Sequence, residues 1–474
     1  MIKKIACTPL FVIVLVNLIL KLVVFCYLSP WDKTTENTNV LVSDSRGYES
    51  VAENLIHHHT FAPPKDTINI NKFSELQASA FLIWYPDGWM MPAYPVFLAS
   101  VYSFTGIKPY AAIFIQILLS LISVVLVYRI CMLLFENIKI AIIAALLFAL
   151  DIHSIYVANQ LLTDTLYVLL FLSGIYYFLK ALKTKKLNLF YVAIIFMGLT
   201  CLTRLVVLVY PVILILILLV FSKQQWKWKL KAIMSYILVF AFMNGIWIVR
   251  NHSQYGKWEI TSHGGYTLLM FNTCFTKERI THESVDSVRV FFQKQADSAG
   301  FRTSKNIFEQ STIYSKVASS YLKQHKGMYL LTNMQGCLNM FLSLGNRGMA
   351  KTLGWTNAKP GEDFAELTPQ RIGKNFSSDA RETILGVLIM VILAVQYMGA
   401  LYGIIKLRKA RHFMLLSLII LTILYYASIT GILGNYRFKL PVVPFICIAA
   451  GYGYAMLKNK GETPVSWLSD KITD

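Results

Sequence analysis

The sequence predicts an all-α, polytopic membrane protein with about ten transmembrane helices. The chain has 474 residues, of which 56% are hydrophobic and only 15% are charged, and its mean hydropathy is +0.53. This composition is far more apolar than that of a soluble globular protein. Apolar runs of roughly 18 or more residues can cross a bilayer as helices. We place these runs near 8–29, 110–134, 139–158, 161–181, 188–203, 205–221, 231–249, 383–404, 412–430 and 437–457.

Basic residues predict the orientation of the chain. The net charge is +20, and most of the excess lies in short loops, at Lys180, Lys183, Lys185, Lys186, Lys223, Lys227, Lys229, Lys231, Lys406, Arg408, Lys409 and Arg411. Short loops rich in Lys and Arg face the cytoplasm. With Lys3 and Lys4 inside and an even number of crossings, both termini are expected in the cytoplasm of an integral plasma (inner) membrane protein. Topology explains the charge, so we expect no nucleic-acid partner.

Two polar stretches divide the chain. Residues 30–109 form the first exterior loop of an N-terminal membrane module that covers 1–249. Residues 250–382 form an exterior soluble segment. Residues 383–474 contain the last membrane helices and a cytoplasmic tail. We expect the first span to be retained as an anchor.

Both exterior segments are expected to contain helices. In the first, apolar residues recur at helical spacing, which predicts an amphipathic helix along the membrane surface; they are Tyr48, Val51, Ala52, Leu55 and Ile56. The second mixes helix-like stretches such as 311–326 with loops that contain Gly and Pro, so we expect a small, mainly helical subdomain. Its two cysteines, Cys274 and Cys337, could be bonded or free.

Ionisable residues gather at one membrane face. Threading the spans brings five of them to the exterior side, namely Asp44, Asp164, Arg204, Arg250 and Arg437. Charges at the edge of a span are costly, so a group at one depth indicates a functional site. Simpler roles exist for some of them. Asp44 could cap the surface helix, and Arg204 could snorkel or pair with Asp164.

Cations on the exterior side favour an anionic ligand. Arg250, Arg437 and Lys439 lie against the usual distribution of positive charge. A guanidinium binds phosphate through two parallel hydrogen bonds. Contact with lipid headgroups is the alternative.

A divalent metal ion is a further expectation. Asp87, in Tyr85-Pro-Asp-Gly-Trp, could join Asp44 as an oxygen ligand. An aspartate in such a sequence could equally serve the turn itself.

Several short motifs, in this order and topology, resemble a known family. They are Asp44-Ser-Arg-Gly-Tyr, Met91-Pro-Ala-Tyr-Pro-Val-Phe-Leu, Leu162-Thr-Asp-Thr-Leu, Gly198-Leu-Thr-Cys-Leu-Thr-Arg, Trp247-Ile-Val-Arg-Asn and Arg437-Phe-Lys-Leu-Pro-Val-Val-Pro. The chain resembles the polyprenyl-phosphate-sugar-dependent glycosyltransferases of the C superfamily. Within it, the likeness is to the protein O-mannosyltransferase and aminoarabinose-transferase-like integral membrane enzymes.

The resemblance implies an outward-facing site in which an acidic residue of the first exterior loop, here Asp44, is essential. Two departures stand out. The family often has Arg-x-Pro-Gly-Tyr-Pro where this chain has Met90-Met-Pro-Ala-Tyr-Pro, and its usual Thr-Glu-Thr-Leu has Asp164 in place of the glutamate. Donor or acceptor contacts are therefore expected to differ from the family pattern.

The residues fit transfer of a hexose or pentose from a polyprenyl-phosphate donor to a hydroxyl of a lipid, glycan or protein. The phosphate is already a leaving group, so cations are needed to hold its developing charge. The candidates are Arg204, Arg250, Arg437 and Lys439. Asp44 is the expected general base of an inverting displacement. Supporting roles are expected for Asp164, Tyr94 and Asn251.

Two other classes of function remain open on the sequence. One is a transporter or flippase of a lipid-linked or anionic substrate, which would favour charges near the middle of the membrane. The other is a non-catalytic subunit of glycan assembly. Membrane lipids are expected partners in every case.

Overall fold

The structure is a computed structural model that describes residues 2–32, 44–61, 88–304, 306–355 and 379–457. Every regular element in these ranges is helical. This confirms the predicted all-α class. A helix hydrogen-bonds all of its own backbone groups, which is why it can cross hydrocarbon.

Each of the ten predicted spans contains an apolar helix, but the predicted span 139–158 is divided into two helices, because the first ends at Ala149 and Asp151 caps a second one. The helices are α1 (Ile2–Leu28), α4 (Pro109–Phe135), α5 (Ile138–Ala149), α7 (Asp164–Thr184), α8 (Leu187–Thr203), α9 (Tyr210–Phe221), α10 (Trp226–Tyr255), α18 (Ala380–Lys409), α19 (Phe413–Thr430) and α20 (Val443–Leu457). Within the described ranges, six segments are long and apolar enough to cross a membrane: Pro9–Leu28, Pro109–Phe135, Asp164–Thr184, Trp226–Tyr255, Ala380–Lys409 and Phe413–Leu433. The remaining four apolar helices are shorter. The protein is an integral membrane protein.

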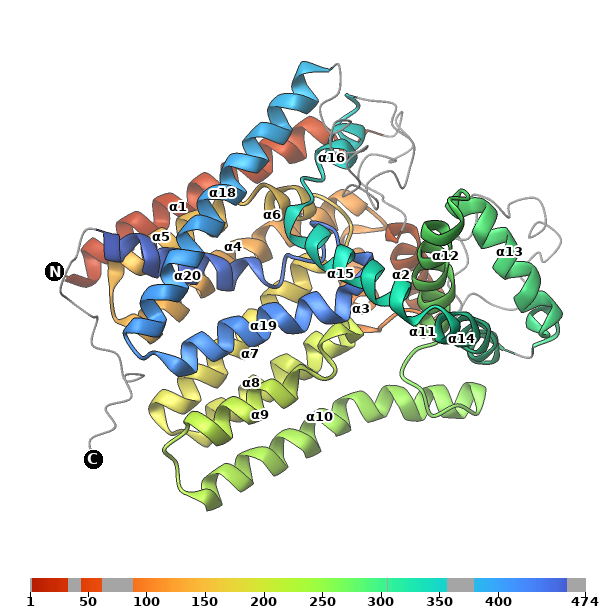
Figure 1. The fold of residues 1–474 in the computed structure, drawn as a ribbon. Coiled ribbons are helices and arrows are strands. Elements are labelled where there is room, and N and C mark those ends of the chain that lie inside the picture. The colour runs from red at the N-terminus through yellow and green to blue at the C-terminus, as the bar shows by residue number, and fades with distance from the viewer. Residues whose placement is uncertain (1, 33–43, 62–87, 305, 356–378, 458–474) are drawn as a thin grey trace.

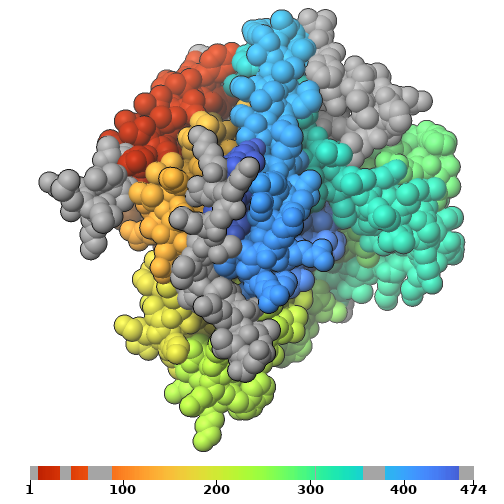
Figure 2. Space-filling view, turned by 60° about the vertical axis from the view of Figure 1, so that its left-hand side comes forward, coloured from red at the N-terminus to blue at the C-terminus, as the bar shows by residue number. Residues whose placement is uncertain are grey.

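The core of the bundle lies around α20. This helix buries most of its side chains and packs against α18 and α5. The approach to α18 is very close, because a Cβ atom on Gly403 would lie 1.9 Å from the carbonyl oxygen of Ala449. Figure 2 shows α18 on the surface of the bundle, between α1 and α15. Glycine at position 403 therefore permits the close contact between the central helix α20 and α18 at the surface.

Shorter helices gather at one end of the bundle (Figure 1). They are α2 (Ser45–His58), α3 (Ala93–Thr105), α6 (Ile152–Val157), α11 (His263–Thr267), α12 (Cys274–Thr281), α13 (Val285–Ser298), α14 (Ile307–Gln324), α15 (Lys326–Leu342) and α16 (Asn346–Thr352). The predicted amphipathic helix is α2, which buries Val51 and Ala52. The helices α11 to α14 share a small apolar core of their own, in which Phe292 and Tyr314 are buried.

The two cysteines of the predicted exterior segment are not joined to each other. Both are free thiols in the structure. Cys274 is buried in the small helical core. Cys337 lies on α15 and its Sγ donates to the carbonyl oxygen of Ala427 over 3.0 Å. Of the two states left open by the sequence, the structure has the free one.

Candidate functional site

Four ionisable residues from four separate segments meet at the end of the bundle near α2 and α3. Asp164 is the first residue of α7. Arg204 directly follows α8, where its extended backbone ends the helix. Arg437 lies in the turn before α20, and Asp44 immediately precedes α2. We refer to Asp44, Asp164, Arg204 and Arg437 as the charge cluster.

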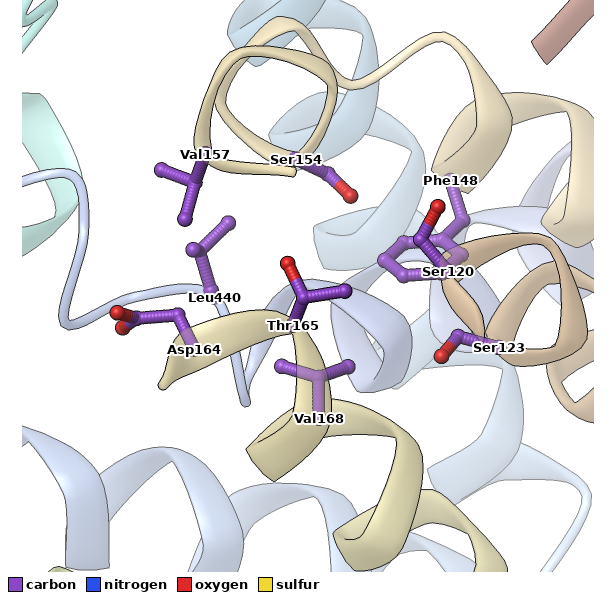
Figure 3. A pocket seen from close by; sticks show the side chains of 9 residues that line it. All are labelled: Ser120, Ser123, Phe148, Ser154, Val157, Asp164, Thr165, Val168 and Leu440. Atoms are coloured by element: carbon purple, nitrogen blue, oxygen red, sulfur yellow. The ribbon is translucent and has the colours of Figure 1, made fainter. Parts of the chain in front are cut away.

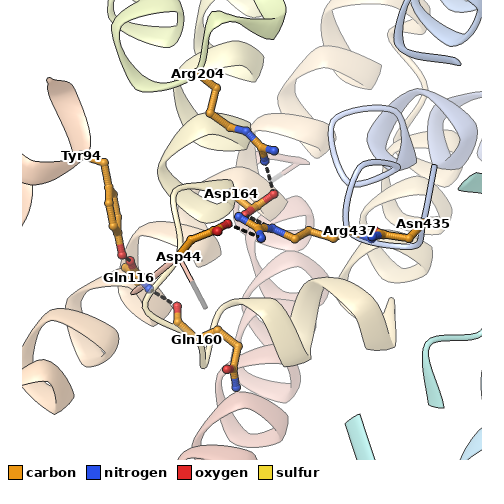
Figure 4. A network of polar contacts seen from close by, with 8 residues as sticks. All are labelled: Asp44, Tyr94, Gln116, Gln160, Asp164, Arg204, Asn435 and Arg437. Carbon is orange, nitrogen blue, oxygen red and sulfur yellow. Dashed lines mark hydrogen bonds and ion pairs between the residues drawn. The ribbon is translucent and has the colours of Figure 1, made fainter. Parts of the chain in front are cut away.

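The charge cluster is a continuous chain of ion pairs (Figure 4). Arg204 donates through Nη1 to Oδ1 of Asp164. Arg437 donates through Nε to Oδ2 of Asp164 over 2.8 Å and through Nη1 to Oδ2 of Asp44 over 2.9 Å. Arg437 therefore bridges the two carboxylates, and positive and negative groups alternate along the chain.

The four side chains differ in exposure. The Asp164 side chain is 1% exposed, those of Arg204 and Arg437 are 16% and 17% exposed, and that of Asp44 is 36% exposed. A buried carboxylate needs charged or hydrogen-bonding partners, and Asp164 has two guanidinium groups. Asp164 thus forms the floor of the cluster, while Asp44 is the acid that solvent can reach.

Asp44 occupies the N-cap position of α2, yet its side chain makes no capping hydrogen bond. Its carboxylate turns to Arg437 instead. The local sequence left both orientations open. The contact with Arg437 decides between them, because in a guanidinium–carboxylate pair both partners are charged.

A chain of hydrogen bonds behind the cluster involves Tyr94, on α3. Its hydroxyl donates to Oε1 of Gln116 on α4. Nε2 of Gln116 donates to the carbonyl oxygen of Gln160 over 2.9 Å. Gln160 lies four residues before Asp164, so Tyr94 supports the segment that presents this acid (Figure 4).

Tyr48 packs between this frame and the cluster. Its ring lies edge-on against Tyr94, with centroids 5.0 Å apart. Burial, and then the negative charge of Asp44, raise the pKa of the Tyr48 hydroxyl to about 12. Tyr48 is therefore protonated at neutral pH and can act as a hydrogen-bond donor.

Arg250 and Asn251, at the end of α10, have different surroundings. The Arg250 guanidinium lies over the rings of Trp247 and Phe61, at 4.6 Å and 5.6 Å from their centroids, and donates to Oδ1 of Asn251 over 2.9 Å. Asn251 is buried and donates to the carbonyl oxygens of Glu259 and Ile260. Asn251 thus holds the turn that leads toward α11.

Lys439 lies next to the cluster without joining it. The side chain is fully buried. Its Nζ donates to the hydroxyl of Tyr397 on α18 over 3.2 Å. Lys439 follows Arg437 by two positions in the sequence, but this lysine points into the bundle.

The metal expectation lies mostly outside the described residues. Asp87 belongs to a range that the structure does not describe. Among the residues it does describe, no group of three or more His, Cys, Asp or Glu side chains is placed to hold a metal ion. Asp44 is bonded to Arg437.

A small cavity adjoins Asp164 on the side of the bundle. Its volume is about 20 Å³. Its walls include four hydroxyl side chains, of Ser120, Ser123, Ser154 and Thr165 (Figure 3). This volume accommodates about one water molecule. Ser120 also accepts a hydrogen bond of 2.6 Å from Nζ of Lys21, which is buried in the middle of α1.

Sequence reasoning did not bring together three aromatic residues, namely Trp89, His263 and Tyr266. Trp89 lies within the predicted first exterior loop, whereas His263 and Tyr266 belong to α11. Their rings pack together with centroids 4.6 to 6.1 Å apart. No local pattern connects positions this distant in the chain, so only the folded structure could reveal the group.

Comparisons with known proteins agree with the fold. The model of the dolichyl-phosphate-mannose-protein mannosyltransferase family matches residues 90–247, which include Asp164 and Arg204. No curated protein matches the chain by sequence.

Solved structures give two likenesses. The oligosaccharyltransferase of Archaeoglobus fulgidus, tethered to an acceptor peptide with the NVT sequon, has a TM-score of 0.51 at 15% identity over 96% of this chain. The present chain covers 51% of that protein, about half of its length. ArnT from Cupriavidus metallidurans, in the apo state, has a TM-score of 0.35 at 12% identity over 87% of this chain and 73% of its own.

The family match and the shared fold cover overlapping parts of the chain. The family model covers the helices that supply two members of the charge cluster. The likeness in fold extends over almost the whole chain. Over residues 90–247 the chain therefore resembles the dolichyl-phosphate-mannose-protein mannosyltransferase family, and over almost its whole length it shares the fold of the oligosaccharyltransferase.

Proposed function

We propose that the protein transfers a hexose or pentose from a polyprenyl-phosphate donor to a hydroxyl group of a lipid, glycan or protein at the exterior membrane face. The observation that carries this proposal is the charge cluster, in which a solvent-accessible carboxylate adjoins two guanidinium groups. A transfer from a phosphate leaving group needs these two kinds of group. The protein O-mannosyltransferase-like and aminoarabinose-transferase-like enzymes are the proposed relatives in function.

The reaction is a single inverting displacement. The acceptor oxygen forms a bond to the anomeric carbon, and the bond from that carbon to the phosphate oxygen breaks. The electron pair of the broken bond stays on the phosphate, where Arg204 and Arg437 stabilise the charge. The acceptor proton passes to the Asp44 carboxylate, which acts as general base.

Donor binding prepares the base. Without a donor, Arg437 is bonded to Asp44 and Asp164 at once. A phosphate that binds Arg437 competes with the more exposed of these carboxylates, which is Asp44. When the phosphate displaces Asp44 from Arg437, the Asp44 carboxylate becomes free to bind the acceptor. Asp164 remains bonded to Arg437 and keeps it in place. Arg250 is a further candidate ligand, whereas Lys439 would have to leave Tyr397 to reach a phosphate.

The test is to replace Asp44 by Asn in cells that lack the native protein. Removal of a general base lowers the rate about a hundredfold or more. We expect the lipid-phosphate sugar to accumulate, with rescue by wild type and by Asp379→Asn but not by Asp44→Asn. Asp379 is an acid at the start of α18 that pairs with Arg381 on the surface.

Two checks accompany this test. Membrane insertion of each variant is verified first, and donor binding by Asp44→Asn is measured on purified protein. The variant should still bind the donor. Equal rescue by Asp44→Asn, or no accumulation without the protein, would refute Asp44 as the base.

One observation favours a carrier as the second candidate. Lys21 is buried in the middle of the first span and bonds Asn17 and Ser120, and Ser120 lines the cavity beside Asp164. Ionisable residues deep in a membrane often mark a substrate path. Translocation of a lipid-linked sugar in liposomes separates the two candidates. A carrier should lose translocation in Lys21→Met, whereas a transferase should form product without translocation.

A further inference from the structure

Trp89, His263 and Tyr266 form a compact aromatic group, which we call the aromatic wall. Trp89 lies 4.6 Å from His263 and 5.0 Å from Tyr266, measured between ring centroids. A hydrogen bond joins the two segments that form the wall. The hydroxyl Oγ1 of Thr261, two residues before His263, donates to the main-chain carbonyl oxygen of Trp89 over 2.8 Å. The segments before and after the main membrane module therefore meet here.

The aromatic wall lies within electrostatic reach of both functional ends of the charge cluster. The charges of Asp44 and Arg204 both act on His263. The charge of Asp44 also acts on Tyr266. Trp89 also lies five residues before Tyr94, whose ring packs at 5.0 Å against that of Tyr48, four residues after Asp44.

The exposure of the wall fits a binding surface. His263 is exposed, and Trp89 and Tyr266 are half-buried. Dense protein around His263 nevertheless lowers its pKa to about 4. His263 is neutral at pH 7, so its two ring nitrogens offer one hydrogen-bond donor and one acceptor.

We propose that the aromatic wall binds the pyranose ring of the sugar that the donor carries. The C–H groups on one face of a pyranose are apolar and pack against aromatic rings, while its hydroxyls can bond His263. The donor sugar is favoured over an acceptor sugar because its anomeric carbon must lie between the phosphate and the base. This inference rests on the proposed function and adds a residue set that recognises the sugar.

The experiment measures binding of two lipids to purified protein in nanodiscs. One is undecaprenyl phosphate, and the other is undecaprenyl phosphate that carries mannose, glucose or galactose in turn. Trp89→Ala and Tyr266→Ala should weaken binding of the sugar-bearing lipid about tenfold or more, as expected for a lost apolar contact. Binding of undecaprenyl phosphate should stay unchanged, because the arginines hold the phosphate. Trp89→Phe should retain most of the affinity.

Two controls keep the result specific. Trp258→Ala removes an aromatic side chain that is 66% exposed and stacks on His252 in the same exterior region. It should change neither affinity. Thermal unfolding verifies that each variant is folded. The contact between Thr261 and Trp89 uses the main chain of Trp89, so it survives the substitution.

The outcomes separate this inference from the proposed function. If the wild type binds both lipids but the wall variants lose neither affinity, or lose both equally, the wall does not bind the donor sugar, although the proposed function stands. If the wild type binds neither lipid, the proposed function fails and the wall proposal fails with it. Selective loss of the sugar-bearing lipid supports both.

Discussion

Arg437 is the residue on which the charge cluster depends. It bonds Asp164 and Asp44 through two different nitrogens, Nε and Nη1. A planar guanidinium can span two carboxylates in this way, whereas a lysine ammonium is a single point charge on a flexible stem. The identity of this cation therefore matters as much as its charge.

The first prediction concerns Arg437→Lys. We expect a lower melting temperature and a donor affinity reduced about tenfold or more, because one ammonium cannot replace the hydrogen bonds to two separate carboxylates, of which Asp164 is buried. Thermal unfolding and lipid binding measure the two effects. Arg381→Lys is the matched control, since Arg381 pairs with Asp379 at the surface and should tolerate the change. Equal behaviour of the two variants would contradict the bridging role.

At the scale of elements, Asp44 immediately precedes α2, and this helix docks through a half-buried acid, Glu49. Tyr102 on α3 donates to Oε1 of Glu49 over 3.5 Å. Burial, and then the charge of Glu53, raise the pKa of Glu49 to about 7. An acid with a raised pKa costs the folded state free energy when it ionises, so the cost is absent at low pH and grows as pH rises.

The second prediction follows from Glu49. Its pKa is about 7 in the folded state and about 4.3 when unfolded. Stability should therefore fall as pH rises from about 4.3 to 7 and should then level off. Glu49→Gln should match the wild type near pH 4.5 and be more stable at pH 8. Thermal unfolding across this range measures the difference. Glu283→Gln, an exposed acid on the helical subdomain, is the control.

A result in the opposite direction would be informative. If Glu49→Gln were less stable than wild type at pH 8, the ionised carboxylate would contribute favourably to the docking of α2. The pKa of Glu49 in the folded state would then lie below its unfolded value, not above it.

At the scale of the whole molecule, the close contact of α18 with α20 determines where the turn with Arg437 lies. Gly453 and Gly403 meet at this contact, and a Cβ atom on Gly453 would lie 2.4 Å from the carbonyl oxygen of Gly399. Small residues allow membrane helices to approach this closely. The helix α20 is thereby held against α18, and the turn that carries Arg437 directly precedes α20.

The third prediction concerns Gly403→Ala. A Cβ atom would lie 1.9 Å from the carbonyl oxygen of Ala449, so α18 and α20 must move apart. We expect a destabilisation of about 1–3 kcal/mol, typical of overpacking, together with weaker donor binding. Gly245→Ala is the control, because a Cβ atom there would meet nothing within 4 Å. Unfolding in detergent compares the two, and a neutral Gly403→Ala would show that the contact can relax.

Much of this architecture follows from the sequence. The spans are visible because hydrocarbon requires long apolar segments whose backbone groups bond within the segment. The gathering of Asp44, Asp164, Arg204 and Arg437 at one end follows from counting crossings. The same count brings Arg250 to that end, although its contacts are with Trp247, Phe61 and Asn251.

The sequence by itself thus determined the fold class and the end of the bundle that carries the charges, because both depend on local hydrophobicity. Only the tertiary structure decided which charges meet. Arg437 turns to the two carboxylates, while Lys439, two residues later, bonds Tyr397 inside the bundle. Trp89 and α11 likewise meet across a long stretch of chain. Such choices depend on the shape of turns and on the packing of distant helices, which local sequence does not encode.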